Sequence, residues 1–312
     1  MRLYYAGDVH GSEKCWRKFL GAARFYEVDT LIMGGDITGK LMVPVVSTAD
    51  GRYEASVLGR PESVAADGLD ELEKRIRFNG FYPYRCDRPE YDRLSSDQEY
   101  RETVFTQLMV DEVERWIHLA EERLAGTGIR CYVMPGNDDE FAIDRALEST
   151  TIVNPDNRVV RVDDDTQMLS CSWTNPTPWD SPREEAEDDL LARLRGLAAQ
   201  LDPGVNTIFN LHCPPYNTSL DRAPQLTSDL KVVLDGGEPR IVPVGAKAVR
   251  TLIEEVQPLL SLHGHIHESK AVAKIGKTTC VNPGSAYSEG VIDGAVVELR
   301  GHKIRSCQLV TG

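Results

Sequence analysis

The sequence predicts an α/β protein in which strands deliver polar residues to one edge of a sheet. Apolar runs of strand length alternate with stretches of helical periodicity, and the first elements form a strand–helix–strand pattern. A polar cluster follows each of several apolar runs: Asp8-Val9-His10, Gly35-Asp36, Gly136-Asn137-Asp138-Asp139 and Gly264-His265-Ile266-His267. Because open α/β sheets bind ligands at the carboxyl ends of their strands, we expect these clusters to meet there.

The composition narrows the class of protein and of partner. With 312 residues and 41% hydrophobic residues, the chain can bury a substantial core, and its formal net charge of −14 disfavours nucleic acid and anionic membranes as partners. A small anionic substrate in a metal-lined cleft remains compatible with that charge. The 7 cysteines include no CxxC pair, which favours a reducing compartment. We therefore expect a soluble, cytoplasmic protein, and leave open whether it forms a homo-oligomer.

The first part of the chain predicts a strand at 2–7, a helix that Ser12 begins, and a buried strand at 30–33. The pattern then loosens over 41–98, which mixes Gly, Pro, Arg and Asp with aromatic residues. One interpretation is an insertion with its own small core. The other is a cap that helps to form the substrate pocket or a subunit contact. In the second case Arg85 and Arg88 are candidates to bind a phosphate.

The remaining elements continue the alternation of strands and helices. In order, we expect a helix at 97–125, a strand at 129–134, strands within 157–173, a helix at 183–200, a strand at 205–211, a long loop at 217–243, a helix at 246–255 and a strand at 258–262. From residue 270 onward an alternating pattern with glycine turns predicts an antiparallel sheet edge. The predicted strands thus come just before the polar clusters and before His212.

The residue types in these clusters suit a pair of divalent cations. Strand side chains alternate between faces, so Asp8 and His10 could leave a strand on the same side and share one cation. Asp36 follows two glycines and could bridge two cations with its two oxygens. His265 and His267 alternate likewise and could reach different ions. Carboxylates and imidazoles together predict a dinuclear site.

Taken in order, the motifs resemble the calcineurin-like metallophosphoesterase family. They are DVHG at 8–11, GGD at 34–36, GND at 136–138, His212 followed by Cys-Pro-Pro, and GHIH at 264–267. The segment Asn282-Pro283-Gly284-Ser285 resembles one that often follows in bacterial and archaeal members. The resemblance implies a four-layer α/β/β/α sandwich with two facing mixed β-sheets. It also implies a single domain over 1–312, with 41–98 as an insertion or cap within it.

The same resemblance implies a ligand assignment and a reaction. A first metal ion would be held by Asp8, His10 and His267, a second by Asn137, His212 and His265, and Asp36 would bridge them. Nitrogen and oxygen ligands of this kind suit Mn, Fe, Co, Ni or Zn better than Mg. The implied reaction is hydrolysis of a phosphoester by a metal-bridging hydroxide, with Asp36, Asn137, Asp138 and His265 as candidate catalytic residues. No serine or cysteine nucleophile is implied, so Cys213 is expected to be a buried neighbour. His263 precedes the glycine of the last motif and is expected to be a packing or supporting residue.

The sequence departs from the family pattern beside Asn137. Many members have a histidine at the position of Asp138, where it contacts the phosphate and can protonate the leaving oxygen. An ionised Asp138 beside cations cannot donate a proton and would repel a dianionic phosphate. Asn137 and Asp138 remain candidates for substrate binding, and we expect a diester to be preferred over a monoester. Asp139 is expected to orient its neighbours.

A second departure follows Asp36, where Ile37-Thr38-Gly39-Lys40 replaces the Asp-Arg pair of many phosphatases. This change disfavours a protein phosphatase, and Lys40 could either bind phosphate or merely face solvent. We therefore expect a phosphodiesterase acting on a small soluble substrate. The alternatives are a phosphomonoesterase or protein phosphatase of the same family, a nuclease, and a non-catalytic scaffold. The acidic composition argues against a nuclease, and the complete set of ligand-competent residues argues against a scaffold.

Overall fold

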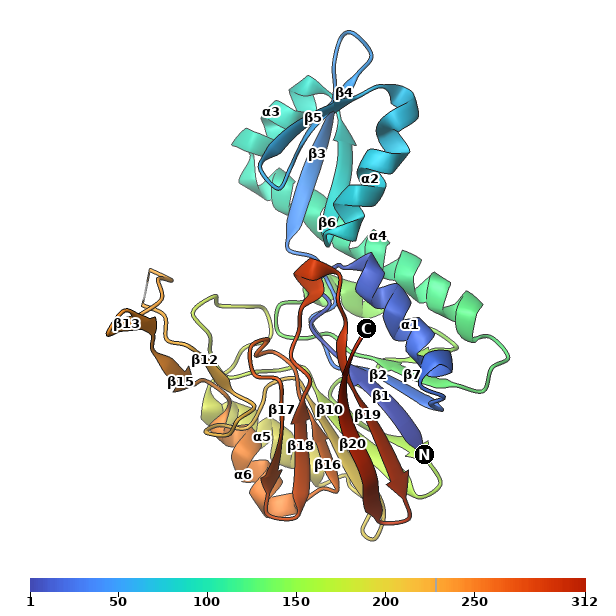
Figure 1. Ribbon diagram of the computed structural model, residues 1–312, viewed down its shortest axis with the longest axis vertical. Helices are drawn as coiled ribbons and strands as arrows, with labels where there is room; N and C mark the ends of the chain where they lie inside the picture. Colours follow the sequence, from blue (N-terminus) through green and yellow to red (C-terminus); the bar gives the residue numbers. More distant parts are fainter. Residues whose placement is uncertain (228) are drawn as a thin grey trace.

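The structure is a computed structural model that describes residues 1–227 and 229–312. Two six-stranded sheets lie at its centre (Figure 1). The first sheet has the order β20-β19-β1-β2-β7-β8. Its strands are β1 (Arg2–Ala6), β2 (Thr30–Met33), β7 (Arg130–Val133), β8 (Ile152–Val153), β19 (Asp293–Arg300) and β20 (Lys303–Thr311). β1, β2, β7 and β8 pair in parallel, whereas β19 and β20 are antiparallel, so the sheet is mixed.

The second sheet has the order β17-β18-β16-β11-β10-β9. Its strands are β9 (Arg158–Asp163), β10 (Thr166–Cys171), β11 (Asn206–Leu211), β16 (Leu260–Leu262), β17 (Ala271–Ile275) and β18 (Thr278–Asn282). β10, β11, β16 and β18 are parallel, and β9 and β17 close the two edges antiparallel. The tail from residue 270 was expected to form one antiparallel edge. It instead completes both sheets, because β17 and β18 join the second sheet and β19 and β20 the first.

Three apolar layers hold the sheets and helices together. Between the sheets, Leu3, Tyr5 and Ile32 of the first pack in one cluster with Met168 and Ile208 of the second. The outer face of the first sheet packs against α1 (Glu13–Phe25) and α4 (Gln98–Leu124), and that of the second against α5 (Glu187–Ala198) and α6 (Lys247–Val256). Strands buried on both faces account for their nearly continuous apolar runs. The four-layer α/β/β/α sandwich predicted from the sequence is confirmed.

The segment 41–98, which we call the cap, stands apart from the sandwich at the top of Figure 1. It contains a four-stranded sheet of order β5-β4-β3-β6 with two helices. The elements are β3 (Leu41–Ser47), β4 (Tyr53–Val57), β5 (Arg60–Val64), η1 (Ala66–Gly68), α2 (Leu69–Phe78), β6 (Phe81–Cys86) and α3 (Arg88–Ser96). Val43, Val45 and Leu72 belong to a hydrophobic cluster confined to this segment. The cap therefore has a small core of its own.

The cap meets the sandwich at a close backbone contact. A Cβ atom on Gly39, the residue before Lys40, would collide with the carbonyl oxygen of Gly80. A Cβ atom on Gly11 would lie 2.7 Å from the Cα atom of Gly39. Only glycine fits such contacts, so the base of the cap is packed directly on the loop that carries His10.

The predicted loop at 217–243 contains short strands in an arm at the left of Figure 1. β12 (Arg222–Pro224) pairs with β15 (Ile241–Pro243), and β13 (Leu234–Asp235) pairs with β14 (Glu238–Pro239). Gly236 and Gly237, both with positive φ, join β13 to β14. A Gly-Gly pair is a hairpin signal, so the prediction of an irregular loop was wrong here; residue 228 of that loop lies outside the described residues. Within 1–227 and 229–312, no helix combines the length and the apolar character needed to cross a bilayer.

Candidate metal centre

The candidate ligands lie just beyond the carboxyl ends of β1, β2, β7, β11 and β16, so both sheets contribute to one edge. β1 ends at Ala6, and Asp8 and His10 follow it with φ of 55° and 38°. Asp36 and His265 also have positive φ, of 51° and 66°. Strand alternation was therefore the wrong reason for expecting Asp8 and His10 on one side. Left-handed turns, which are uncommon for residues other than glycine, aim these side chains individually.

The first group consists of Asp8, His10, Asp36 and His267, whose ligand atoms all lie within 4.8 Å of one another. The Nε2 atoms of His10 and His267 are 3.1 Å apart. His10 Nε2 is 3.7 Å from a carboxylate oxygen of Asp36, and His267 Nε2 is 3.4 Å from one of Asp8. Two imidazoles and two carboxylates thus face a common point.

The second group consists of Asp36, His212 and His265, again with ligand atoms within 4.8 Å. His212 Nε2 lies 3.3 Å from Asp36 Oδ1 and 3.1 Å from Asn137 Oδ1. Asn137 thereby joins this group through its side-chain oxygen. Asp36 belongs to both groups, and its two oxygens face different sides: Oδ2 is the atom near His10 and Oδ1 the atom near His212.

Buried hydrogen bonds fix the orientation of these ligands. His212 Nδ1 lies 2.8 Å from the carbonyl oxygen of Gly34, which leaves Nε2 to face the group. Asp8 accepts the backbone N–H of His265 at 2.9 Å. The carboxylate of Asp139 accepts three backbone N–H groups, from Ile37, Thr38 and Gly136. Asp139 therefore ties the loop after β2 to the loop after β7, and such supporting contacts tune metal sites.

The pKa values of Asp36, His212 and His265 show where the site favours positive charge. Burial raises the pKa of Asp36 to about 6. Burial lowers the pKa of His212, but the nearby carboxylates of Asp36 and Asp8 outweigh it and raise that pKa to about 10. Burial lowers the pKa of His265 to about 3, so its imidazole is neutral. The site favours a cation between Asp36 and His212, whether that cation is a proton or a metal ion.

The donor set fits divalent cations. Asp8 and Asp36 are 1% and 3% exposed, and buried carboxylates are costly unless positive charge accompanies them. Imidazole nitrogens, carboxylate oxygens and an amide oxygen are ligands for borderline ions such as Mn, Fe, Co, Ni and Zn. His10 contributes Nε2 to the first group, while its buried Nδ1 has no hydrogen-bond partner within the described chain. The residues therefore match the group that the sequence implied.

Asp138 and Lys40 form an ion pair beside the second group, with Lys40 Nζ 2.5 Å from Asp138 Oδ2. Ser181 Oγ donates to Asp138 Oδ1 at 2.9 Å and accepts from Asn137 Nδ2 at 3.0 Å. Burial raises the pKa of Asp138, but Lys40 outweighs it and holds that pKa at about 2. Lys40 thus lies beside the second group and pairs with Asp138, so it does not merely face solvent. Ser181 was not predicted, since no motif surrounds it.

Tyr287 is a second neighbour that sequence reasoning missed. It begins η3 (Tyr287–Glu289), and its ring lies 4.7 Å from that of His10 and 5.9 Å from that of His267, measured between centroids. The preceding segment holds the site together as well, because Ser285 Oγ donates to the backbone oxygen of Asp8. The resemblance of residues 282–285 to a family segment was the signal that could have led to Tyr287.

Four other predicted positions lie outside the ligand groups. Arg85 pairs with Glu73 and Asp70, and Arg88 pairs with Asp92, all within the cap or its helices. The structure thus does not bring either arginine to the ligands. His263 is buried, with Nδ1 2.9 Å from the carbonyl oxygens of Leu211 and Cys213 and Nε2 2.8 Å from Ser261 Oγ. Cys213 is buried and donates to Asn175 Oδ1.

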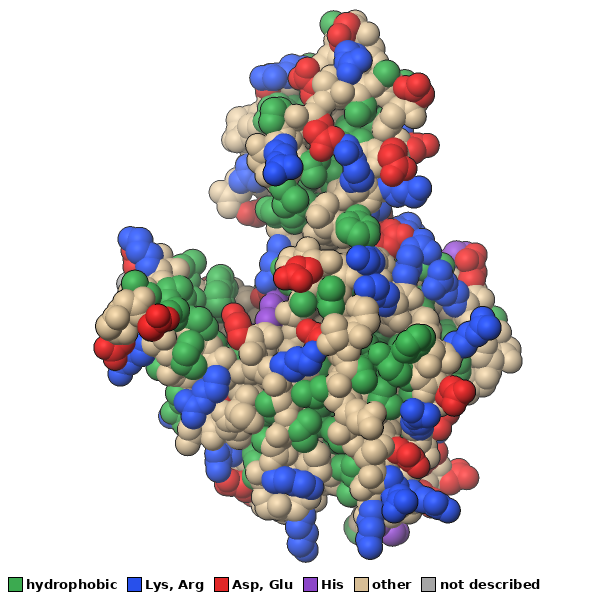
Figure 2. All heavy atoms as spheres, in the orientation of Figure 1, with side chains coloured by type: hydrophobic (Ala, Val, Ile, Leu, Met, Phe, Trp, Pro, Cys, Tyr) green, Lys and Arg blue, Asp and Glu red, His purple; other side chains and the backbone are tan. Residues whose placement is uncertain are grey.

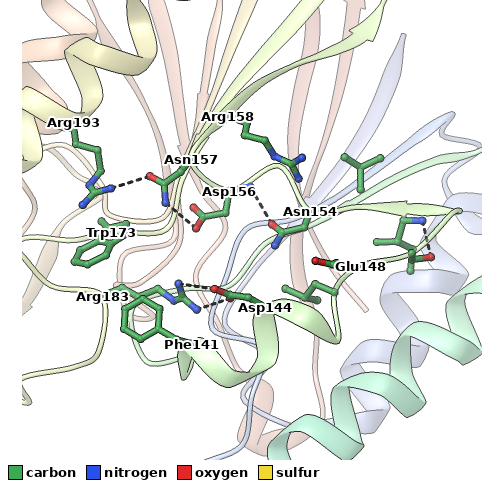
Figure 3. A pocket seen from close by; sticks show the side chains of 14 residues that line it. Phe141, Asp144, Glu148, Asn154, Asp156, Asn157, Arg158, Trp173, Arg183 and Arg193 are labelled. Atoms are coloured by element: carbon green, nitrogen blue, oxygen red, sulfur yellow. Dashed lines mark hydrogen bonds and ion pairs between the residues drawn. The ribbon is translucent and has the colours of Figure 1, made fainter.

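A cavity of about 720 Å³ is lined by side chains from 141–158 and 173–193 (Figure 3). Phe141 and Asp144 of η2 (Phe141–Arg145) line it together with Trp173 and Arg183. Arg183 donates to the Asp144 carboxylate and, from Nε, to the backbone oxygen of Asp139. It therefore connects this cavity to the loop at 137–139. None of the metal-ligand candidates lines the cavity, and we place the chemistry at the ligand groups instead.

Comparisons with known proteins agree with this architecture. No family model matches the chain. A stretch of 152 residues is 31% identical to the uncharacterized protein MJ1162 of Methanocaldococcus jannaschii and covers 48% of this chain and 62% of that protein, less than two thirds of its length. A solved crystal structure at 15% identity has a TM-score of 0.58 and covers 98% of both chains. The crystal structure of TT1561 of Thermus thermophilus, at 13% identity, has a TM-score of 0.52 and covers 100% of this chain and 97% of its own. At these identities the likeness shows a shared fold.

Proposed function

We propose that this chain is a metal-dependent phosphoester hydrolase of the calcineurin-like metallophosphoesterase type. One observation carries the proposal: Asp36 is shared by two ligand groups, with one carboxylate oxygen turned toward each. A shared carboxylate between imidazole-rich groups is the arrangement that a dinuclear hydrolase requires. The order of the sequence motifs supports the same reading.

The first group, Asp8, His10, Asp36 and His267, would hold one divalent ion, and the second, Asp36, Asn137, His212 and His265, would hold the other. Mn, Fe, Co, Ni and Zn are the candidates, and the chain does not select among them. Two such ions, when bound, lower the pKa of a shared water and neutralise negative charge on phosphoryl oxygens. Within the chain, the Asp139 carboxylate accepts the backbone N–H of Gly136, and the Gly34 carbonyl oxygen contacts Nδ1 of His212. These contacts orient the candidate ligands.

The substrate class that we propose is a small phosphodiester, such as a nucleotide derivative. Binding of a dianionic monoester is strengthened most by several cationic side chains. A monoanionic diester carries less charge and needs fewer cationic side chains for binding. Lys40 lies beside the ligand groups and is already paired with Asp138, while Arg85 and Arg88 are paired in the cap. The charge available to a phosphate therefore favours the diester.

A cytoplasmic location fits the cysteines, which are all free.

A hydrolysis panel tests this function. Purified protein stripped of metal would be supplied with each divalent ion in turn and assayed on a chromogenic diester and the matching monoester. We expect hydrolysis to depend on the added metal, with kcat/KM about tenfold or more higher for the diester, which corresponds to about 1.4 kcal/mol. Monoester preference would support the phosphomonoesterase alternative. Stoichiometric metal binding without turnover on any substrate would support the scaffold alternative and end the proposal.

A further inference from the structure

We infer that Lys40 is the residue that binds the substrate phosphate at this site, and that Asp138 tunes its charge so that monoanionic diesters are selected over dianionic monoesters. The inference rests on the proposed function and deepens it. It assigns a paired role to two residues that replace a histidine and a phosphatase Asp-Arg motif in the sequence pattern. It also assigns a function to the base of the cap.

The Lys40–Asp138 pair lies at the mouth of the ligand groups. Asp138 N donates to Asp36 Oδ1 at 3.1 Å, so the Asp138 backbone is one hydrogen bond from the carboxylate that both ligand groups share. The side chain of Asp138 is 26% exposed and that of Lys40 is 51% exposed, whereas that of Asp36 is 3% exposed. The pair is therefore accessible to solvent directly beside the buried ligands.

The surface of the molecule supports this position. Figure 2 shows a notch between the cap and the arm that carries β12 and β15, with histidine and Lys or Arg side chains visible at its base. Asp or Glu side chains are visible beside them, so the base of the notch carries charges of both signs.

The ammonium group of Lys40 keeps donors for a ligand. It has three N–H donors, and Asp138 is the one ion-pair partner of Lys40 among residues 1–227 and 229–312. Two donors are therefore available to the non-bridging oxygens of a phosphate. Asp138 in turn is held by Ser181, which fixes the carboxylate that aims the ammonium. A lysine so oriented binds phosphate with less loss of side-chain freedom than a free lysine would.

The charge of the pair accounts for the selection between esters. Lys40 and Asp138 together carry no net charge, so they offer hydrogen bonds without an excess positive charge. The missing positive charge weakens the electrostatic attraction of a diester, with one negative charge, only a little. It weakens the attraction of a dianionic monoester much more. Asp138 thus acts as a specificity-determining residue through Lys40. The ammonium is supplied from the base of the cap, because Lys40 lies between Gly39 and β3.

The experiment measures phosphate affinity and substrate preference in manganese-loaded protein. Inorganic phosphate would be titrated by calorimetry into wild type, Lys40→Met, Lys40→Arg, Asp138→Asn and the control Lys74→Met. Lys74 is an exposed lysine paired with Glu71 in the cap. We expect Lys40→Met to weaken phosphate binding about 10- to 100-fold, the range of a hydrogen bond to a charged group, and Lys40→Arg and Lys74→Met to change it by less than about threefold.

Substrate preference gives the second readout. Asp138→Asn leaves the ammonium uncompensated, so we expect the ratio of monoester to diester kcat/KM to rise about tenfold. Lys40→Met should raise KM on both substrates more than it lowers kcat, with bound manganese and melting temperature unchanged. Lys40→Gln provides a second variant if Lys40→Met fails to fold.

The outcomes separate this inference from the proposed function. Phosphate affinity unchanged in both Lys40→Met and Lys40→Gln, or an unchanged ester ratio in Asp138→Asn, overturns the inference even when wild type is an active diesterase. A wild-type protein that binds phosphate through Lys40 but hydrolyses nothing overturns the proposed function and supports the assignment of Lys40.

Discussion

The ligand groups and the cap treat charge in opposite ways. In the ligand groups, Asp8, Asp36 and His212 are almost completely buried. In the cap, Arg85 and Asp70 pair at the surface, with exposed fractions of 53% and 96%. Buried charges are costly unless paired or bound to a cation, whereas exposed pairs contribute little. The cap also buries one carboxylate, that of Glu73, but pairs it with Arg85 and Arg77. The difference teaches that several buried acidic and imidazole groups without an arginine or lysine partner, in the part of the chain that the structure describes, mark the candidate site.

The backbone shows the same contrast. Asp8, His10, Asp36 and His265 occupy left-handed conformations, which are costly for residues with a Cβ atom. In the cap, among its described residues, Leu58 is the non-glycine with positive φ, and it lies in the turn between β4 and β5. Four of the left-handed residues outside the cap are thus candidate ligands, and this conformation places their side chains at the site. Substitutions in the two regions should therefore have different consequences.

The largest effect should follow from Asp36→Asn. Substitution of residues that merely support metal ligands typically costs about 10–100-fold in metal affinity or activity, so a residue shared by both groups should cost more than about 100-fold. We expect hydrolysis and bound metal to fall together, as measured by turnover and by elemental analysis of the dialysed protein. A variant that retains both ions and full turnover would show that Asp36 is not shared between them.

Metal affinity should also depend on pH. In the folded protein without metal the pKa of His212 is raised to about 10, so below that pH its imidazole carries a proton that a metal ion must displace. The affinity should therefore increase as pH rises, by about tenfold per pH unit for each proton displaced, between about pH 6 and 9. Calorimetric titration in buffers of different ionisation enthalpy measures both the affinity and the proton release. An affinity independent of pH would contradict the assignment of His212.

A third prediction concerns the close approach of the loops after β2 and β7. A Cβ atom at Gly136 would collide with the side chain and the backbone nitrogen of Asp36. We expect Gly136→Ala to lower the free energy of unfolding by about 1–3 kcal/mol, as overpacking does, and to weaken metal binding. The matched control is Gly196→Ala, because Gly196 lies in α5 with open space around it.

The control should act in the opposite direction. Alanine in a helix interior is favoured over glycine by about 0.5–1 kcal/mol, so Gly196→Ala should stabilise the protein without changing metal affinity. Chemical denaturation measures the first quantity and metal titration the second. Equal effects of the two substitutions would mean that the contact at Gly136 does not position Asp36.

The sequence allowed the architecture, and the convergence of the candidate ligands at one sheet edge, to be anticipated to a large extent. Apolar runs ending in Gly35-Asp36 or Gly264-His265 predicted both the strands and the edge where their polar residues meet. The helix predicted at 97–125 is α4, Gln98–Leu124, with Asp97 as its N-cap. Local periodicity suffices for such elements, because a buried face and a cap are encoded within a few turns.

Other features depend on contacts between distant residues and could not be read from local patterns. The Lys40–Asp138 pair joins positions that no motif links, and Ser181 approaches them from a loop without periodicity. Arg85 and Arg88 looked suited to a phosphate, but acidic partners within the cap or its helix engage them. Asp8 and His10, both with left-handed φ, donate backbone hydrogen bonds to Gly35 and Asp36, which are distant in sequence. Tertiary contacts of this kind decide function while leaving little trace in composition.

The cap and the sandwich should also respond differently to loss of a core side chain. Leu72 is 1% exposed in the cap core, and Leu194 is 1% exposed between α5 and the second sheet. Each Leu→Ala substitution should lower stability by about 2–5 kcal/mol. Because the cap has a separate core, we expect Leu72→Ala to increase hydrogen exchange mainly in 41–98 while bound metal remains, and Leu194→Ala to affect the whole sandwich. Identical exchange patterns would show that the cap and sandwich unfold as one unit.

The smallest effect should come from Arg85→Ala, which tests the surface chemistry of the cap. Its partners Glu73 and Asp70 lie in the cap. The pair with exposed Asp70 contributes about 0–1 kcal/mol, and the buried carboxylate of Glu73 keeps Arg77 as a second partner when Arg85 is removed. We expect a melting temperature within a few degrees of wild type and kcat/KM within about twofold on the diester, since the guanidinium is occupied within the cap. A loss of more than about tenfold in kcat/KM with the fold intact would mean that the cap closes and presents Arg85 to the substrate. That result would break the contrast between the cap and the ligand groups, because surface charge of the cap would then belong to the catalytic site.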